Sequence, residues 1–246
     1  MKTGRLLPLI LSAILLSHFA GASAKPQKQA ILFNSQSRTY YLLVPEKLSS
    51  PAPLILLLHG SGRDGMSQID AWKALAEEQK VILLAPNSFK SEEWSFSADP
   101  PEFFKVLLDA VSNAYQVDGQ RVYLFGHSAG ASFALYLAIM ESEYFAATAV
   151  HAGALKGDSD AYMEHAPRKI PVAIWVGTKD QFFSLENVRK TRDKFKEHGF
   201  PVQLTEMPGH DHDYYSVAGN LNKTIWEFFS ASQLPGEPNW EDYRPR

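Results

Sequence analysis

The chain has 246 residues, of which 45% are apolar, and its formal net charge is −3. This length and composition fit one domain with a sizeable core. The small net charge, without any cluster of Lys and Arg, argues against a nucleic-acid partner and against a membrane-surface patch. Because the sequence contains no cysteine, disulfides, thiolate metal sites, a cysteine nucleophile and a lipoprotein anchor are excluded.

Residues 1–24 have the pattern of an export signal. Lys2 and Arg5 precede an apolar stretch from Leu6 to Leu16, and Ala22-Ser23-Ala24 supplies the small residues that a signal peptidase requires. The stretch is shorter than the about 20 apolar residues of a membrane span, and a single anchor helix is the alternative. We expect a mature domain over 25–246 in a bacterial periplasm or outside the cell, since secreted eukaryotic domains more often carry disulfides.

The mature chain alternates strand-like and helix-like stretches, with no repeat and no long linker. Strands are expected where apolar or β-branched residues run continuously up to a Gly or Pro, at 39–44, 54–58, 81–85, 122–125, 147–150, 172–176 and 202–207. Helices are expected at 68–79, 102–115, 129–140, 185–198 and 216–231, followed by an irregular tail over 233–246. This alternation predicts a mostly parallel, twisted sheet with helices on both faces.

One segment has the form G-x-S-x-G. It reads Gly126-His127-Ser128-Ala129-Gly130 and joins an expected strand to an expected helix. The nucleophile of α/β-hydrolases occupies such a strained strand-to-helix turn, and small residues let the two arms of the turn approach. The motif predicts an α/β-hydrolase fold with Ser128 as the nucleophile. The alternative is a structural turn with a capping serine.

An acyl-transfer enzyme must also stabilise the charge of its tetrahedral intermediate, usually with two backbone N–H groups. One is expected from Ala129, the residue after the nucleophile. The other is expected from the loop after the strand at 54–58, where we assign Ser61, with Gly62 as the alternative donor. His59 is expected to orient this loop. A phosphate-binding loop is disfavoured because no G-K-[ST] follows the glycines, and a structural Gly-rich turn is the remaining alternative.

The acid of this fold follows the nucleophile along the chain, and the histidine comes last. Asp180 lies on the loop after the strand at 172–176, where a carboxylate can hold a histidine in the required tautomer. Asp158 and Asp160 belong to a polar stretch that is more typical of a solvated surface. We therefore expect Asp180 to be the acid.

The base is expected after the last strand, in a segment that contains both His210 and His212. Periodicity does not choose between them. The alternating His and Asp residues are also a pattern for metal binding, but a metal needs at least three well-placed ligands and no other His/Asp cluster completes the set. No metal and no cofactor is therefore expected. His151, at the end of another strand, is expected to be packed rather than reactive.

The segment from Asp99 to Gly130, with "DPPEFF" and "YQVDGQRVYLFGHSAG", and the upstream "LLHGSG" resemble a known branch of the α/β-hydrolases. This branch contains feruloyl esterases, acetylxylan esterases and polyhydroxybutyrate depolymerases. The resemblance extends over most of the mature chain in element order. It implies an esterase with a Ser-His-Asp triad and no cofactor. The sequence carries neither the disulfides of the fungal members nor a carbohydrate-binding module, which weakens the case for a polysaccharide substrate.

The segment "GHDHDYY" is similar to the "G-x-D-H-S-Y-Y" segment of S-formylglutathione hydrolases, a related esterase group. In that group the histidine that precedes the small or polar residue and the paired tyrosines is catalytic. The similarity implies that His212 is the base, because His210 falls on the variable position.

Aromatic residues follow several of the expected strands. Their loops share the carboxyl edge of the sheet, where ligands bind in open α/β folds. Such side chains can form an acyl or phenolic pocket, and ordinary loop packing is the alternative for each of them. The residues that we expect to contact substrate are Trp94, His127, Phe182 and Tyr214.

The expected function is an exported serine carboxylic-ester hydrolase. The stretch after Gly153 is too short for a large lid, which favours a small or extended ester, free or linked to a polymer, over a long acyl chain. The alternatives are a polyhydroxyalkanoate depolymerase-like activity, a serine peptidase with the same triad, and a non-catalytic binding protein on the same fold. The sequence does not indicate an oligomeric state.

Overall fold

The computed structural model describes residues 25–48, 50–157 and 159–240. The predicted export signal, 1–24, lies outside these residues, and so do Asp158 and the end of the tail. In the described ranges no helix has the length and apolar character of a membrane span. Residues 233–240 form neither helix nor strand, as predicted for that part of the tail.

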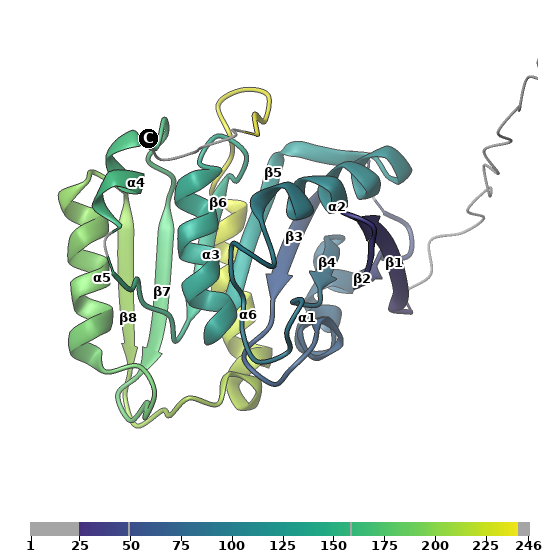
Figure 1. The fold of residues 1–246 in the computed structure, drawn as a ribbon. Coiled ribbons are helices and arrows are strands. Elements are labelled where there is room, and N and C mark those ends of the chain that lie inside the picture. Colours follow the sequence, from purple (N-terminus) through teal and green to yellow (C-terminus); the bar gives the residue numbers. More distant parts are fainter. Residues whose placement is uncertain (1–24, 49, 158, 241–246) are drawn as a thin grey trace, which may run out of the picture.

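An eight-stranded sheet forms the centre of the molecule, with the strand order β1-β2-β4-β3-β5-β6-β7-β8 (Figure 1). Strand β2 pairs antiparallel with β1 and β4, and all the other neighbours are parallel. The prediction of a mostly parallel sheet is thereby confirmed. The strands are β1 (Gln27–Phe33), β2 (Gln36–Leu43), β3 (Ala52–Leu58), β4 (Ile82–Pro86), β5 (Val117–His127), β6 (Ala147–His151), β7 (Val172–Gly177) and β8 (Val202–Met207).

Helices cover both faces of the sheet, as the alternating pattern predicts. Helices α1 and α6 pack on one face, and α2, α3, α4 and α5 contribute to the core on the other. Each face buries the apolar side of its helices, which is the condition for a stable layered α/β domain. The helices are α1 (Gly65–Gln79), α2 (Pro101–Ala114), α3 (Ala129–Met140), α4 (Asp160–His165), α5 (Leu185–Glu197) and α6 (Tyr214–Ser230).

Strand β3 shows why the central strands are continuously apolar. Leu54, Leu56 and Leu58 point into one core, and Ile55 and Leu57 point into the other. All five side chains are fully buried. A strand with helices on both faces has no solvent-facing side, and so needs no polar alternation.

Two elements of the structure were not predicted from the sequence. Strand β1 alternates half-buried and exposed residues at the edge of the sheet, and its first residues, Gln27, Lys28 and Gln29, give a weak strand signal. The segment that begins with Asp160 forms the short helix α4, although it was expected to be a polar loop. Strand β5 also begins at Val117, earlier than the apolar run that predicted it.

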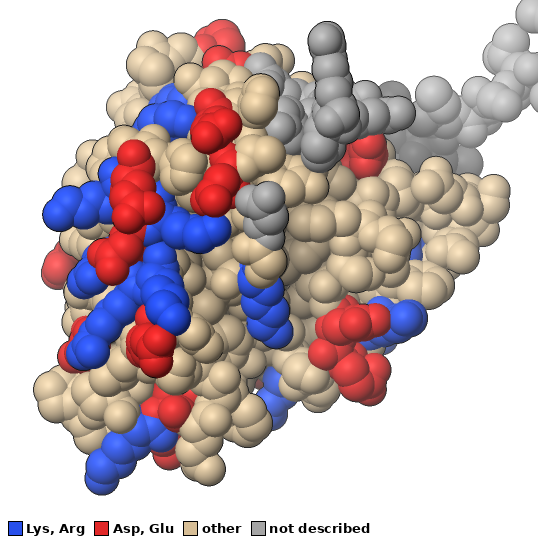
Figure 2. All heavy atoms as spheres, turned by 60° about the vertical axis from the view of Figure 1, so that its left-hand side comes forward, with Lys and Arg blue, Asp and Glu red and all other residues tan. Residues whose placement is uncertain are grey.

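The outer face of α5 carries charges of both signs. Figure 2 shows the blue and red side chains interspersed on the side of the molecule where α5 lies. Lys190 pairs with Glu186 along the helix, and Arg189 pairs with Glu206 of the neighbouring strand β8. Exposed pairs of this kind contribute little to stability, and the mixture leaves no field of a single sign on this face.

Strands β3, β5, β6, β7 and β8 end at the same edge of the sheet (Figure 1). Parallel strands necessarily bring the loops at their carboxyl ends together, and ligands bind there in open α/β sheets. The loops that carry the predicted nucleophile, acid and base therefore meet at one edge, although they are far apart in the sequence.

Leu56→Ala should destabilise the protein by about 2–5 kcal/mol, because it opens a cavity between fully buried side chains. Leu32→Ala is the matched control, since Leu32 also lies on a strand but is 72% exposed, and it should change stability by less than about 0.5 kcal/mol. Urea unfolding measures both. Equal stabilities of the two variants would contradict the burial of Leu56.

Candidate active site

The turn between β5 and α3 holds Ser128 in a strained conformation. Its φ is 56° and its ψ is −118°, a region that residues with a side chain rarely adopt. A Cβ atom on Gly126 would lie 2.3 Å from the carbonyl oxygen of Gly130, and one on Gly130 would lie 2.4 Å from that of Leu58. Both glycines of the motif are therefore required, because the arms of the turn touch each other and the end of β3.

The structure brings three of the predicted site residues together. His212 Nε2 lies 2.8 Å from Ser128 Oγ, and His212 Nδ1 lies 2.7 Å from Asp180 Oδ2. The Asp180 side chain is fully buried, and its Oδ1 accepts the N–H groups of Phe182 and Phe183 at 2.8 and 2.9 Å. Because an ionised carboxylate only accepts hydrogen bonds, Nδ1 of His212 carries the proton and Nε2 is free to accept one from Ser128.

The loops that carry Asp180 and His212 are bonded to each other. Lys179 donates its N–H to the carbonyl of His210, and Gly209 donates its N–H to Thr178 Oγ1, both at 2.8 Å. A Cβ atom on Gly177 would lie 2.2 Å from the His210 carbonyl oxygen. This close approach fixes the distance between the two loops.

His210, the other candidate for the base, faces a different partner. Its Nε2 lies 3.1 Å from His151 Nε2, and His151 Nδ1 lies 3.2 Å from His127 Nδ1. The three imidazoles form a histidine row beneath the active site. Burial, together with the neighbouring histidines, lowers the pKa of His127 to about 4 and that of His151 to about 2. Both side chains are therefore neutral at physiological pH.

The predicted oxyanion donors, Ser61 and Ala129, border one cavity together with Ser128. Gly62 already donates its N–H to the Ser91 carbonyl at 2.8 Å, which removes it as the alternative donor. For the N–H groups of Ser61 and Ala129, the described part of the chain provides no acceptor. The Ala129 N–H is in the first turn of α3, where helical N–H groups lack an internal partner.

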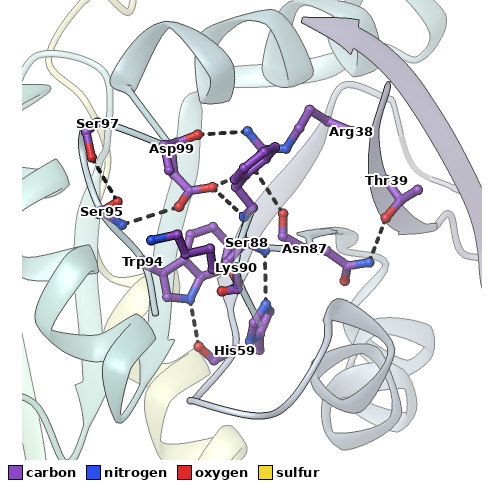
Figure 3. Close-up of polar contacts among 12 residues, drawn as sticks. Arg38, Thr39, His59, Asn87, Ser88, Lys90, Trp94, Ser95, Ser97 and Asp99 are labelled. Atoms are coloured by element: carbon purple, nitrogen blue, oxygen red, sulfur yellow. Dashed lines mark hydrogen bonds and ion pairs between the residues drawn. The ribbon is translucent and has the colours of Figure 1, made fainter. Parts of the chain in front are cut away.

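His59 is held in one orientation and one tautomer. Its Nε2 accepts the Ser88 N–H at 3.1 Å, so the proton must be on Nδ1, which donates to the Gly60 carbonyl at 2.8 Å. The His59 carbonyl accepts the indole N–H of Trp94 at 2.8 Å (Figure 3). Burial lowers the pKa of His59, which keeps the ring neutral. These contacts agree with the expectation that His59 orients the Gly60–Ser61 loop.

Two cavities meet at Ser128. The first, of about 340 Å³, is lined by polar side chains that include Arg63, Gln181 and Tyr215, and is called the polar pocket below. The second, of about 1240 Å³, is called the aromatic groove. Ser61, Ser128 and His212 line both. The aromatic side chains of the groove are Trp94, Phe96, Phe133, Tyr136, Phe182 and Phe183.

Three of the four residues expected to contact substrate line these cavities. Trp94 and Phe182 lie along the aromatic groove, and His127 lies at the polar pocket. The expectation for Tyr214 is wrong: its side chain is fully buried and its hydroxyl donates to Asn222 Oδ1 at 2.7 Å. Tyr215 lines the polar pocket instead, because α6 begins at Tyr214 and turns that side chain into the core.

Arg63 and Gln181 were missed, since nothing in the sequence distinguishes them from other polar loop residues. Asp160, the weaker candidate acid, pairs with Lys194 on α5 at 3.0 Å. In the ranges that the structure describes, no group of three or more His, Asp or Glu side chains is arranged to hold a metal ion.

Known proteins resemble this chain in sequence and fold. The bifunctional acetylxylan esterase/xylanase XynS20E of Neocallimastix patriciarum is 25% identical over 166 residues, which are 64% of this chain and 24% of that protein. The poly(3-hydroxybutyrate) depolymerase of Ralstonia pickettii is 25% identical over 135 residues, which are 46% and 28% of the two chains. The matches therefore span only about a quarter of the length of these relatives. A solved ferulic acid esterase shares the fold, with a TM-score of 0.68 at 17% identity over 84% of this chain and 98% of that one.

Two family profiles match the chain. The profile of the dienelactone hydrolase family matches residues 95–227, and that of FrsA-like esterases matches residues 26–158. Each match covers more than half of the sequence, and together they include the segments that carry the predicted nucleophile, acid, base and oxyanion donors. The resemblance inferred from the sequence motifs is thereby confirmed, and the protein belongs to the dienelactone hydrolase and FrsA-like esterase families of α/β-hydrolases.

Proposed function

We propose that this protein is a serine carboxylic-ester hydrolase that forms an acyl-enzyme on Ser128. The observation that carries the proposal is the position of His212, within hydrogen-bond distance of both the Ser128 hydroxyl and the buried Asp180 carboxylate. A serine becomes a nucleophile when a base takes its proton and a carboxylate stabilises the imidazolium that forms. The arrangement lies at the junction of two cavities that are open to a substrate.

In the first half of the reaction, His212 Nε2 takes the Ser128 proton while Ser128 Oγ bonds to the ester carbonyl carbon. The carbonyl oxygen becomes an oxyanion and accepts the N–H groups of Ser61 and Ala129. As the tetrahedral intermediate collapses, the bond to the alcohol oxygen breaks. His212 then returns its proton to that oxygen, and the alcohol leaves.

In the second half, a water molecule takes the place of the alcohol. His212 accepts a proton from the water while its oxygen attacks the acyl carbon, and the same two N–H groups stabilise the second intermediate. Cleavage of the bond to Ser128 Oγ releases the carboxylic acid, and His212 returns the proton to the serine. These steps need no cofactor.

The contacts favour His212 over His210 as the base. His210 Nε2 is engaged with His151, and the Asp180 carboxylate bonds to His212. A base needs a partner that fixes its tautomer as well as contact with the nucleophile. Of the two histidines, His212 meets both conditions, and His210 supports the loop from beneath.

The two cavities suggest how an ester is oriented. The aromatic groove suits an aromatic or extended apolar acyl group, and the polar pocket with Arg63 and Tyr215 suits a hydroxyl-rich or small alcohol. The names of the relatives, an acetylxylan esterase and a polyester depolymerase, support an ester linked to a polymer or its fragments. We therefore propose aryl and short-chain acyl esters as the substrate class.

Ser128→Ala and His212→Ala should each lower kcat/KM for methyl ferulate and for 4-nitrophenyl acetate by on the order of 10⁴-fold or more. His210→Ala is the matched control and should lose less than about tenfold, because it removes a supporting contact and leaves the proton path intact. Initial-rate kinetics measure all three.

A large loss in His210→Ala with a small one in His212→Ala would move the base to His210. Faster hydrolysis of 4-nitroanilides than of 4-nitrophenyl esters would favour a peptidase, and an inactive parent would remove the esterase proposal.

His127 and His151 should make the protein less stable in acid. His151 has a lowered pKa in the folded state because it is buried, whereas an unfolded histidine titrates near 6.5. Below that pH the unfolded chain binds protons that the folded protein does not, so the free energy of unfolding falls as pH drops from about 6.5 toward 4. The slope is up to about 1.4 kcal/mol per pH unit for each such histidine.

His151→Gln should therefore flatten the dependence of stability on pH between about 6.5 and 4. Urea unfolding at several pH values measures the slope, and the absolute stability of the variant does not enter the comparison. His165→Gln, which changes an exposed histidine, should leave the slope as it is in the parent. Parallel curves for the parent and His151→Gln would show that His151 is already charged or accessible in the folded protein.

A further inference from the structure

The Gly60–Ser61 loop, which carries the proposed oxyanion donor, forms neither helix nor strand. Hydrogen bonds with the segment 88–95 hold it in place. The Ser88 N–H donates to His59 Nε2 at 3.1 Å, and the Trp94 indole N–H donates to the His59 carbonyl at 2.8 Å. Gly62 in turn donates its N–H to the Ser91 carbonyl at 2.8 Å. These three bonds bracket the Gly60–Ser61 peptide, whose N–H is the proposed oxyanion donor.

A buried ion pair anchors both ends of this segment (Figure 3). Asp99 Oδ1 accepts the Phe89 N–H at 2.8 Å and Arg38 at 2.5 Å, and its Oδ2 accepts the Ser95 N–H at 3.3 Å. Asp99 is fully buried and Arg38 nearly so. The guanidinium also lies 3.8 Å from the centre of the Phe103 ring. The ion pair therefore holds the backbone of the segment at Phe89 and at Ser95, on both sides of Trp94.

Trp94 takes part both in the aromatic groove and in the hydrogen bonds that hold the Gly60–Ser61 loop. Its ring is a wall of the aromatic groove, and it packs against Phe133 and Phe104 with ring centres 5.7 and 5.9 Å apart. Its N–H restrains the His59 carbonyl, one peptide away from the proposed donor. Gly60 has no side chain to restrain its backbone, so hydrogen bonds determine where the Ser61 N–H points. The Gly60 carbonyl accepts the His59 ring N–H at 2.8 Å and the Arg63 N–H at 3.2 Å, and the indole bond holds the preceding peptide.

We propose that Trp94 is a positioning residue that couples occupation of the aromatic groove to the geometry of the oxyanion hole. An acyl group that packs on the indole holds the ring in place, and the ring holds the His59 carbonyl and the following peptide. The contact between the acyl group and Trp94 then stabilises the transition state, in which the oxyanion develops, more than it stabilises the ground state. This inference rests on the proposed esterase function and specifies how acyl groups are selected: those that reach Trp94 raise kcat.

The test uses two esters with the same leaving group and similar carbonyl reactivity, 4-nitrophenyl propanoate and 4-nitrophenyl 3-phenylpropanoate. In the parent, kcat should be about tenfold higher for the phenyl-substituted ester, whose ring reaches the groove. Trp94→Phe keeps an aromatic wall and removes the N–H, so the ratio of the two kcat values should fall toward one while KM changes less than about threefold. Trp94→Tyr, which also lacks the indole N–H, should give the same result.

Trp226→Phe is the matched control. The Trp226 indole N–H donates to Gln79 Oε1 at 3.0 Å, and its ring packs on the core of the opposite sheet face. This variant loses an equivalent bond away from the site and should keep the ratio of the parent.

A second readout separates positioning from a general structural effect. A boronic acid carrying the 2-phenylethyl group mimics the tetrahedral intermediate, and its Ki should rise in Trp94→Phe by the factor that kcat/KM falls. The Ki of 3-phenylpropan-1-ol, an uncharged compound that fills the groove without forming an oxyanion, should stay unchanged. An unchanged kcat ratio, or a loss confined to KM, would overturn the coupling while leaving the esterase function standing. An inactive parent would instead contradict the esterase function itself.

Discussion

The strained turn at Ser128 is the constraint on which the arrangement of the site depends. A positive φ at a residue with a side chain costs on the order of 1–3 kcal/mol and persists only where the surroundings enforce it. Here the Ser128 N–H donates to the His151 carbonyl at 3.0 Å, and the glycines at 126 and 130 let the backbone contacts close. The strain lifts the hydroxyl above the sheet edge, and every other group of the site is placed relative to that position.

The parallel sheet supplies the second condition. Because neighbouring parallel strands end together, the loops after β3, β5, β7 and β8 meet without any long excursion of the chain. Close backbone approach aligns these loops: Gly177 lies against the His210 carbonyl, and this contact fixes the loop of His212 relative to the loop of Asp180. In this arrangement the His210 side chain bonds to His151, and the His212 side chain bonds to Ser128.

Sequence patterns predicted most of this architecture because they follow directly from burial. The apolar runs of β3, β4 and β7 are continuous since both faces are covered, and G-x-S-x-G marks the strained strand-to-helix turn that holds Ser128. The half-exposed edge strand β1 gave no such signal. Tyr214 was misplaced because α6 begins two residues earlier than its apolar pattern indicates, which turns Tyr214 inward and Tyr215 outward. The choice between His210 and His212 required a family resemblance, since residue types alone leave both open.

The Arg38–Asp99 pair illustrates what patterns in the sequence cannot reveal. Its partners are 61 residues apart, and burying two charges gains little net stability over an apolar pair of the same size. What the pair provides is specificity: two carboxylate oxygens fix backbone N–H groups in a segment that forms no helix and no regular strand. An apolar contact has no direction and would let this segment slide. A charged anchor that is hydrogen-bonded to the backbone on both sides of Trp94 therefore suits the proposed role of this residue in positioning the peptide beside Ser128.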